Sequence, residues 1–584
     1  MEMVKLSINN MEVEVPASST VLEAAKEAGI HVPTLCYLKE QNEIGACRVC
    51  VVEVEGARTL QASCVLPVRE GMVVKTNTKR VRDSRKTTTE LLLANHNREC
   101  LMCSRSGNCE LQNLSEELGV SDVAFQGEKR EEIIDDLSPS IVRDTSKCIL
   151  CGRCVSACKK GQGLGVLDFQ NRGFDTIVGP AFGVSMKDAP CVYCGQCMIV
   201  CPVAALREKS DIERVWDAIE DPDTHVVMQT APAVRAALGE EFGLEIGTRV
   251  TGRMVAAIRR LGVDRVFDTN FGADLTIMEE GHELLHRIQN GGVLPMITSC
   301  SPGWVRHCEL NHPEFLDNLS SCKSPAQMFG AVAKSYYAEK KNIDPKKIFV
   351  VSAMPCTSKK SEAAREELNV NGLRDVDAVV TTRELAKMIK QTRLDFVNLP
   401  DENFDDDFIG DYSGAGVIFG ATGGVMEAAL RTVADVITGE DLADFEYNAV
   451  RGLAGIREAN VQIGDMEVKV ALAHSTLEAT KLLEMVKSGE KDYHFIEIMG
   501  CSGGCVCGGG QPQQPAFVLN SGIDIRKERA KALYEEDTVL AVRKSHQNED
   551  IKKLYSDYLG KPNGHKSHEL LHTTYKKREA YPID

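Results

Sequence analysis

The 584-residue sequence has no long apolar run, no excess of positive charge and no low-complexity segment. No stretch approaches the ~18 apolar residues of a membrane-spanning helix. The first residues, MEMVKLSINN, lack the apolar core of a secretory signal peptide. The formal net charge of −17 disfavours nucleic acid as the main partner, because phosphate binding favours a basic surface. We therefore expect a soluble, cytoplasmic, globular protein with no membrane span and no nucleic-acid partner.

Cysteine, in contrast, is abundant, with 22 residues. Disulfides are rare in a reducing cytoplasm, and a chain of this length can bury its own cores, so thiolate ligation of metal is the better explanation. Fifteen of the cysteines lie between Cys36 and Cys201. This asymmetry predicts an N-terminal half built around metal clusters and a C-terminal half that holds a different site.

Local patterns predict the secondary structure of the two halves. Apolar residues alternate over 4–15 around Asn9-Asn10, which is typical of a hairpin. Ser19 or Thr20 is positioned to cap the following helix, VLEAAKEAG. After about residue 210, short apolar runs alternate with helical stretches, which indicates an α/β domain. We expect the acidic segment DENFDDDF to be a solvated loop.

The first metal motif is C-x10-C-x2-C-x13-C. A glycine precedes its central pair, where the chain must wrap closely around inorganic sulfide. Four thiolates with a tight C-x2-C pair suit a [2Fe–2S] centre, whereas structural zinc also takes four cysteines. The β-rich context and the long first gap favour iron–sulfur. The ligands expected are Cys36, Cys47, Cys50 and Cys64.

The second motif is H-x3-C-x2-C-x5-C, formed by His96, Cys100, Cys103 and Cys109. Three cysteines do not complete a [4Fe–4S] cubane, so a fourth ligand is required, and His96 lies where that ligand is expected. The alternative is a polar surface histidine. Imidazole in place of a thiolate makes a cluster less negative, which raises its reduction potential.

Two C-x2-C-x2-C-x3-C runs follow, as in two-cluster ferredoxins, where the fourth cysteine of each run ligates the other cluster. One predicted cubane set is Cys148, Cys151, Cys154 and Cys201, and the other is Cys158, Cys191, Cys194 and Cys197. Four clusters in series would conduct electrons toward another redox site.

Three later cysteines come directly after short apolar runs. Cys300 follows VLPMITS, Cys356 follows IFVVSAMP and Cys501 follows HFIEIMG, with Cys505 four residues beyond. Ligands of open α/β sheets bind outside the carboxyl ends of strands, so these loops are expected to meet at one buried site. The remaining cysteines are interpreted as buried structural residues: Cys308, Cys322 and Cys507.

The segments TSCSPGW (298–304), MPCTSKK (354–360) and EIMGCSGGCVCGGGQP (497–512) resemble the three active-site loops of [FeFe]-hydrogenases. The resemblance extends over essentially the whole chain. It implies an H-cluster, in which a [4Fe–4S] cubane is joined through a cysteine to a two-iron unit with carbonyl, cyanide and a bridging dithiolate. It also implies that the enzyme interconverts H2 with protons and electrons.

The resemblance implies roles for individual residues. Cys356, Cys501 and Cys505 are the implied cubane ligands, with Cys505 bridging to the two-iron unit, and Lys359 is implied to hydrogen-bond a cyanide. The family usually has two adjacent cysteines in the first loop, and this chain has Cys300 and Ser301. Either Ser301 ligates iron and Cys300 relays protons, or Cys300 ligates iron and the relay differs. A serine alcohol is a poor ligand beside a thiolate, and the sequence leaves both alternatives open.

A proton route is also implied. Glu280, Glu283 and Arg287 share one helix face by spacing. The resemblance puts Glu280, Ser320 and Glu283 on the route, whereas without it a solvated charged face is the simpler interpretation. The glycine-rich stretch 413–424 does not fit a dinucleotide motif, and we interpret it as tight helix–sheet packing. Any NAD(P) chemistry would then lie on another subunit.

The predicted organisation is multidomain, α+β and α/β. It comprises an N-terminal β-grasp-like [2Fe–2S] ferredoxin domain (1–78), a His/three-Cys [4Fe–4S] segment (79–125), a two-[4Fe–4S] ferredoxin-like domain (138–209), a C-terminal α/β catalytic domain (210–525) and a small-subunit-like segment (526–584). The cofactors expected are one [2Fe–2S] cluster, three accessory [4Fe–4S] clusters and the H-cluster.

The function predicted is reversible H2 oxidation and proton reduction by the catalytic subunit of an NAD(P)-linked or electron-bifurcating complex. Ferredoxin, NAD(P)-flavin subunits and maturation proteins are the expected partners. A stand-alone ferredoxin-linked hydrogenase is the alternative within the family. Outside it, residues 1–205 also resemble the cluster-bearing subunit of respiratory complex I, which suggests an electron carrier, and a hydrogenase-like sensor or assembly protein is a third class.

Overall fold

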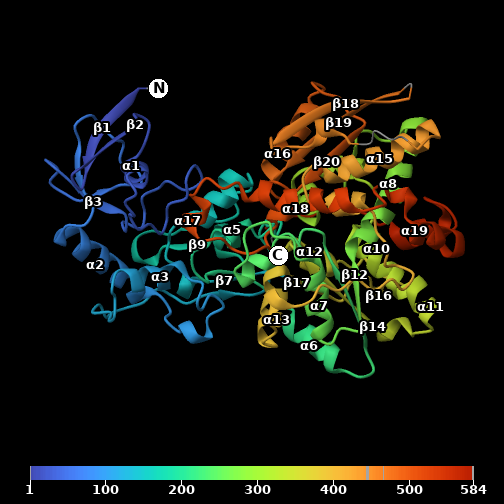
Figure 1. Ribbon diagram of the computed structural model, residues 1–584, viewed down its shortest axis with the longest axis horizontal. Helices are drawn as coiled ribbons and strands as arrows, with labels where there is room; N and C mark the ends of the chain where they lie inside the picture. Colours follow the sequence, from blue (N-terminus) through green and yellow to red (C-terminus); the bar gives the residue numbers. More distant parts are fainter. Residues whose placement is uncertain (1, 442–445, 465, 582–584) are drawn as a thin grey trace.

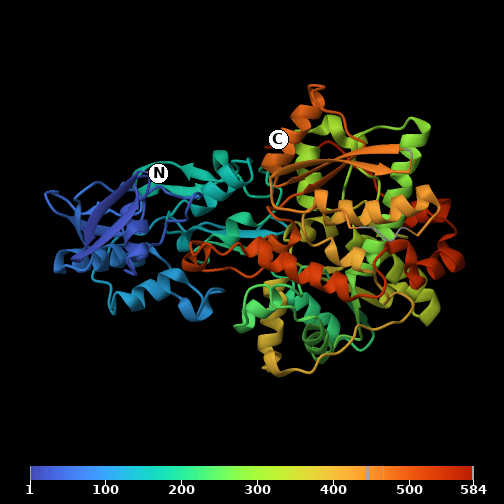
Figure 2. The same ribbon diagram turned by 45° about the horizontal axis from the view of Figure 1, so that its top comes forward.

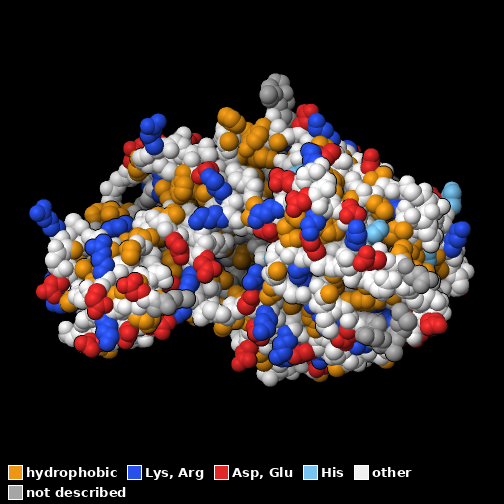
Figure 3. All heavy atoms as spheres, turned by 90° about the horizontal axis from the view of Figure 1, so that it is seen from above, with side chains coloured by type: hydrophobic (Ala, Val, Ile, Leu, Met, Phe, Trp, Pro, Cys, Tyr) orange, Lys and Arg blue, Asp and Glu red, His pale blue; other side chains and the backbone are white. Residues whose placement is uncertain are grey.

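A computed structural model describes residues 2–441, 446–464 and 466–581. The N-terminal cluster-binding region lies at one side of a larger C-terminal body (Figure 1). Acidic and basic side chains are interspersed on the face seen in Figure 3. In the described part of the chain, no helix has both the length and the apolar character needed to cross a membrane.

The N-terminal hairpin is confirmed. β1 (Met3–Ile8) pairs antiparallel with β2 (Met11–Pro16), and Asn9 and Asn10 both have positive φ, as a type I′ turn requires. Thr20, rather than Ser19, caps α1 (Val21–Glu27) in a capping box with Glu23. The sheet has the order β2-β1-β5-β3-β4 and is completed by β3 (Val51–Val54), β4 (Gln61–Ala62) and β5 (Val73–Lys75).

The next cysteines lie in loops and short helical turns around two helices and a small three-stranded sheet. α2 (Lys79–Asn95) and α3 (Glu110–Glu117) precede the sheet β10-β7-β6. The buried Arg153 forms a bidentate ion pair with Glu110 at 2.8 and 2.9 Å, which ties α4 to α3. The other elements here are β6 (Ile134–Asp135), β7 (Ile141–Asp144), α4 (Arg153–Ser156), β8 (Asp168–Gln170), β9 (Ile177–Gly179), α5 (Gln196–Ile199) and β10 (Leu206–Glu208).

The C-terminal body contains two four-stranded sheets. The first is wholly parallel, in the order β12-β11-β14-β17, and its strands are buried because helices cover it. Its strands are β11 (His225–Thr230), β12 (Arg265–Asp268), β14 (Ile348–Met354) and β17 (Ala378–Thr381). The main helices beside it are α6 (Ile212–Glu220), α7 (Thr251–Arg260), α10 (Pro325–Val332), α11 (Ala338–Lys341), α12 (Ser358–Ala363) and α13 (Thr382–Gln391).

The second sheet has the order β13-β20-β19-β18, with only β18 antiparallel to its neighbour. Its strands are β13 (Met296–Ile297), β18 (Ile456–Ile463), β19 (Met466–His474) and β20 (Phe495–Met499). The strand–helix alternation predicted after residue 210 is therefore present. The predicted strand-end cysteines, however, follow strands of two different sheets, so they do not lie along the edge of a single one.

The other main helices of the body are α8 (Thr269–Asn290), α9 (Pro302–Asn311), α14 (Gly414–Ile418), α15 (Gly424–Thr438), α16 (Thr476–Lys487) and α18 (Ile525–Val539). α18 crosses the middle of the molecule in both ribbon views (Figure 2). A Cβ on Gly414 would lie 1.9 Å from Asp537 of α18, and one on Gly416 would lie 2.7 Å from Asn270 O of α8. Gly414 and Gly416 thus serve helix–helix packing, whereas Gly423 at the end of the stretch contacts the sheet by donating to Glu497 of β20, so the prediction of helix–sheet packing is confirmed only in part.

The acidic segment 401–408 also differs from its prediction. Glu402 pairs with Arg259 and Arg260, and Asp405 Oδ2 accepts a 2.7 Å hydrogen bond from Val266 N. These contacts hold the segment against α7 and the edge strand β12. The donors are arginine side chains of α7 and a backbone N–H group on the outer side of β12. The segment is therefore fixed along the edge of the sheet, and its residues are only partly exposed to solvent.

The C-terminal segment wraps back onto the body. α17 (Ala516–Leu519) lies near the cluster region, whereas α19 (Glu549–Leu554) and α20 (His565–Leu571) pack on the far side beside α8 and α10. Lys323 N donates to Leu571 O at 2.8 Å, and Thr573 N donates to Ser321 O at 2.8 Å. These bonds place His572 directly against Cys322.

Candidate active site and cluster sites

The four cysteines of the first motif converge in the N-terminal domain. All four are buried and none forms a disulfide, and the Cys50 and Cys64 sulfurs lie 3.3 Å apart. Hydrogen bonding by Cys36 lowers the pKa of Cys47 to about 6, and hydrogen bonding by Cys64 lowers that of Cys50 to about 7. The pKa values of Cys36 and Cys64 are raised by the same hydrogen bonds, so two of the four crowded thiols ionise readily, which fits a thiolate-bound cluster.

His96 ends α2 and is buried, which contradicts its interpretation as a surface residue. Its Nδ1 has no hydrogen-bond partner. Burial lowers the pKa of His96 to about 4, so the imidazole is neutral and offers a free lone pair. Cys100 is exposed, and Cys103 and Cys109 are partly buried. An orphaned neutral imidazole four residues before Cys100 is available as the fourth ligand of a His/three-Cys cluster.

The two ferredoxin-like runs are brought together as the spacing predicts. One small cavity is lined by Cys148, Cys151, Cys154 and Cys201. Cys158 lies close enough to Cys191 and Cys194 to raise the pKa of both thiols, although burial is the larger cause. The first set therefore lines a cavity, and most of the second set lies in the same core.

This cluster region docks directly on the active-site loops. Thr357 Oγ1 donates to Tyr193 O at 2.7 Å, and Ser358 Oγ donates to Val192 O at 2.8 Å. A Cβ on Gly509 would lie 2.1 Å from Cys194 O, so glycine is required for this approach. The loop around Cys194 is thereby held against the loop that carries Cys356.

The strand-end loops meet between the two sheets. Burial raises the pKa values of Cys300, Cys356 and Cys501 and raises that of Cys505 to about 12, and neighbouring thiols add to the shift of several of them. A Cβ on Gly508 would lie 2.2 Å from Pro355 O, which shows how closely the loops approach. Such buried thiols do not ionise readily by themselves, but a bound iron ion favours the thiolate form. These thiols therefore fit an iron site.

Lys359 lies beside these thiols at the start of α12. Its ammonium donates to Ser324 Oγ at 2.7 Å, to Glu362 Oε2 at 2.8 Å and to Cys300 O at 3.3 Å. The side chain is mostly buried, and its charge lowers the pKa of Cys356. A buried cation of this kind is suited to hold an anionic ligand.

Cys300 and Ser301 face different neighbours. Ser301 Oγ accepts a 3.1 Å hydrogen bond from Gly500 N, directly before Cys501. The Cys300 thiol lies in the field of Glu280, Cys505 and Lys359. The two adjacent side chains thus have different neighbours within the site.

The carboxylates of α8 form a buried row. Ser320 Oγ donates to Glu283 Oε2 at 3.0 Å, and Arg287 Nη2 donates to Glu283 Oε1 at 2.6 Å. Glu280 is 1% exposed, and burial together with the Glu283 charge raises its pKa to about 8. The alternative of a solvated charged face is therefore wrong for Glu280.

Sequence reasoning missed several neighbours of the site. Cys322, interpreted as structural, has its thiol 3.7 Å from Glu283 Oε2. Glu362 lies three residues after Lys359, a helical spacing that could have indicated the pair. Glu497 is buried in β20 and accepts from Gly423 N and Met426 N, and the lone carboxylate within an apolar run was its signal. Cys308, by contrast, donates to His312 O and remains a structural residue.

Models of known families match along most of the chain. They are a 2Fe-2S iron-sulfur cluster binding domain (1–79), the NADH-ubiquinone oxidoreductase-G iron-sulfur binding region (85–124), a 4Fe-4S dicluster domain (144–205), the C-terminal domain of the iron-only hydrogenase large subunit (224–509) and the iron hydrogenase small subunit (523–578).

Similar proteins cover nearly the whole chain. The NADP-reducing hydrogenase subunit HndD of Solidesulfovibrio fructosivorans is 49% identical over 99% of this chain and 100% of its own. Iron hydrogenase 1 of Clostridium pasteurianum is 46% identical over 98% and 99%. A solved variant of the [FeFe]-hydrogenase HydA1 from Chlamydomonas reinhardtii is 42% identical, with a TM-score of 0.57, over 63% of this chain and 99% of its own.

One conclusion follows from the buried thiols at the strand ends, from the cluster region docked on their loops and from these matches. The enzyme is an oxidoreductase that acts on H2, with [2Fe–2S] and [4Fe–4S] domains attached to an H-cluster domain. The chain belongs to the [FeFe]-hydrogenase family.

Proposed function

We propose that this chain is the catalytic subunit of an NAD(P)-linked or electron-bifurcating hydrogenase complex. The observation that carries the proposal is the full-length similarity to an NADP-reducing hydrogenase subunit. The chain offers no dinucleotide motif of its own, since its glycine-rich stretch serves helix packing. Flavin and NAD(P) binding therefore belong to partner subunits, and ferredoxin is a further electron partner.

The experiment is purification from the native host followed by assay of H2 oxidation. Co-purifying flavoprotein subunits and reduction of NAD(P) are the expected results. Activity of the isolated chain with ferredoxin alone, and no co-purifying flavoprotein, would favour the stand-alone alternative. That alternative has support in the similarity to Iron hydrogenase 1 over 98% of the chain.

The predicted accessory ligands form an electron route of one [2Fe–2S] and three [4Fe–4S] clusters. His96 completes the second centre, which its orphaned Nδ1 supports. The set of Cys158, Cys191, Cys194 and Cys197 lies last before the active site, because Cys194 contacts the loop of Cys356 and Cys501. During H2 oxidation electrons leave the active site through this set, and during proton reduction they reach the active site by the same path.

At the active site, Cys356, Cys501 and Cys505 would hold the cubane, and Cys505 would also hold the two-iron unit. When bound, the H-cluster supplies an open iron position where H2 is formed or cleaved. Lys359 holds the cyanide end of that unit by hydrogen bonding, and Glu362 keeps its ammonium in place. The buried loops exclude bulk water from the reacting position.

We assign Ser301 to the cubane position and Cys300 to the proton relay. Ser301 Oγ is held beside Cys501 by Gly500 N, which supports the first assignment. The Cys300 thiol lies in the field of Glu280, which supports the second. Protons then pass between Cys300 and the surface through Glu280, Ser320 and Glu283.

The five segments named from the sequence remain the proposed domain division, with a β-grasp-like first domain, a ferredoxin-like third domain and an α/β catalytic domain. The separate family matches support this division. Residues 1 and 582–584 of the outer segments lie outside the described part. Dedicated maturation proteins are proposed partners, and the cytoplasm, where NAD(P) is available, is the proposed location.

A further inference from the structure

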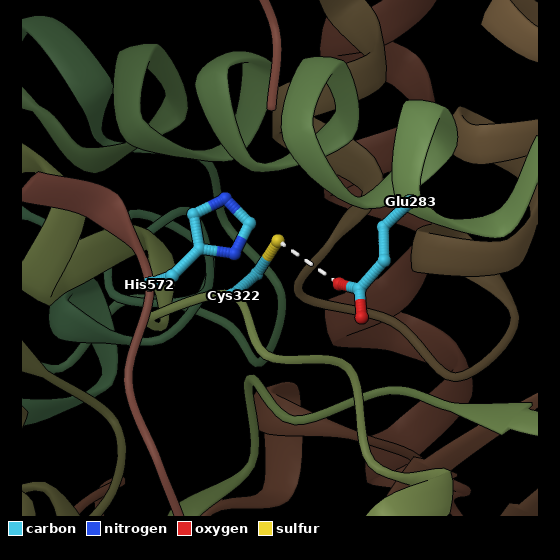
Figure 4. A group of neighbouring side chains, drawn as sticks. All are labelled: Glu283, Cys322 and His572. Atoms are coloured by element: carbon cyan, nitrogen blue, oxygen red, sulfur yellow. Dashed lines mark hydrogen bonds between the residues drawn. The ribbon is translucent and has the colours of Figure 1, made fainter. Parts of the chain in front are cut away.

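Three metal-binding side chains from distant parts of the chain meet behind the proton route. Glu283 comes from α8, Cys322 from the segment before α10, and His572 follows α20 (Figure 4). One donor atom from each lies within 4.8 Å of the other two. Cys322 is 1% exposed and His572 is 7% exposed. No other group of three such donors is this close in the residues that the structure describes.

His572 is oriented as metal-binding histidines commonly are. Its Nε2 lies 3.1 Å from Glu279 Oε2, and that carboxylate also accepts from Tyr555 and from Asn563 N at 2.7 Å. A carboxylate that receives one ring N–H fixes the tautomer and leaves the other nitrogen as a donor. Nδ1 is that nitrogen, and it is occupied only by the rotatable Ser321 hydroxyl at 2.8 Å.

The local charge favours a cation. Glu279, Glu280 and Glu283 surround the Cys322 thiol, and after burial these three charges are the causes that raise its pKa. The Arg287 guanidinium donates only to Oε1 of the Glu283 carboxylate, while Oε2 faces the Cys322 thiol. A divalent ion would compensate the thiolate and carboxylate charges together.

The sequence HELLH occurs at 282–286 and again at 568–572, but neither copy forms the zinc site of a metalloprotease. His572 lies past the end of α20 with extended backbone, and its Nε2 faces Glu279, so it is not the second histidine of a helical zinc pair. In the other copy, His282 Nδ1 is bonded to Met278 O. The candidate site takes one donor from each copy, Glu283 and His572, together with Cys322.

We propose that Glu283, Cys322 and His572 form a binding site for Zn²⁺ or a similar divalent ion that accepts mixed sulfur, nitrogen and oxygen ligands. Three protein ligands and one water make the common four-coordinate arrangement. On binding, the Cys322 thiol loses its proton to solvent and the sulfur forms the bond to the metal, so no oxidant is needed. His568 is exposed and stacks on His572, with ring centroids 4.3 Å apart. This pair of imidazole rings connects the surface to the site.

Occupation of this site has a consequence for turnover, which rests on the proposed proton route. A metal bound to Glu283 Oε2 displaces the hydrogen bond from Ser320 and removes the carboxylate from proton transfer. Zinc is then expected to lower H2 turnover, and a chelator to restore it.

The test is crystallography of the full chain soaked with Zn²⁺, with data collected above and below the zinc absorption edge so that iron does not contribute to the difference. A peak bounded by Glu283, Cys322 and His572 is expected. Cys322→Ala should abolish this peak, whereas Cys308→Ala, which removes a buried thiol elsewhere, should retain it. Absence of the peak in the wild-type crystals, or its persistence in Cys322→Ala, overturns the site.

Turnover in the matured enzyme separates the site from the proton route. Zinc inhibition that is weakened at least tenfold by Cys322→Ala and unchanged by Cys308→Ala supports both the metal site and the proton route. A crystallographic peak without any inhibition upholds the metal site and contradicts the role of Glu283 in proton transfer. Inhibition that is equal in both variants, without the peak, places zinc elsewhere and overturns the proposal.

Discussion

The Ser320 hydroxyl donates a 3.0 Å hydrogen bond to Glu283 Oε2, which connects the segment before α10 to α8. Arg287 fixes the other oxygen of the same carboxylate at 2.6 Å. Glu283 is therefore held in one orientation, with the surface on one side and Glu280 on the other. This arrangement is what a proton route requires of a relay carboxylate.

Replacement of that carboxylate tests the route. Glu283→Gln preserves the shape and keeps one accepting oxygen, but it cannot take up a proton, so turnover should fall by at least ~10²-fold. Iron content and cluster spectra should be unchanged. Glu220→Gln, on the exposed end of α6, is the matched control and should keep full activity. A wild-type rate in Glu283→Gln would remove this residue from the route.

The pKa of Glu280 predicts a titration near pH 8, because burial and Glu283 favour the neutral acid, while Ser320 and Arg287 oppose this. The folded state then holds the proton more tightly than the unfolded one, so stability falls as the pH rises from about 4.5 to about 8. Difference infrared spectra should show a protonated carboxyl band at pH 7 that disappears through pH 8. The band should be missing in Glu280→Gln; its loss already below pH 5 in the wild type would contradict the account.

The first loop offers a pair of variants. Cys300→Ala should leave the cubane spectrum intact and remove turnover, because a relay thiol is lost and no ligand is. Ser301→Cys restores the family's cysteine pair, and it should assemble the site and retain activity. If Cys300→Ala no longer assembles the site, Cys300 is the ligand and the assignment of the two residues must be exchanged.

Close packing of the loops predicts a structural failure. Gly508→Ala places a Cβ 2.2 Å from Pro355 O, so the loops of Cys356 and Cys505 must separate. The variant should bind less iron in the catalytic domain while its accessory clusters remain. Gly127→Ala, where nothing lies within 4 Å of the added carbon, is the control. Equal iron content in the two variants would show that the loops can shift without loss of the site.

Local signals predicted the parts of this protein that depend on local chemistry. The turn at Asn9-Asn10, the cap at Thr20 and the grouping of the ferredoxin-like cysteines follow from short-range spacing, and the structure places each as expected. The strand-end cysteines were also recognisable, because apolar runs of strand length precede them.

The remainder depends on tertiary contacts that no spacing encodes. Cys322 and His572 are 250 residues apart in sequence and meet only because the C-terminal segment folds back onto α8 and α10. The split of the strand ends between two sheets is likewise set by pairing between distant strands, such as β13 with β20. The ion pairs that fasten the acidic segment 401–408 depend on α7, about 140 residues earlier.

The central claim is that the thiols at the strand ends hold an H-cluster. Infrared spectroscopy of the protein, produced with and without the family's maturation enzymes, tests it most directly. The account predicts carbonyl and cyanide bands and H2 evolution only in the matured protein, with the accessory cubanes present in both. Matured protein without these bands, or robust H2 evolution from a host that lacks the maturation enzymes, would contradict it.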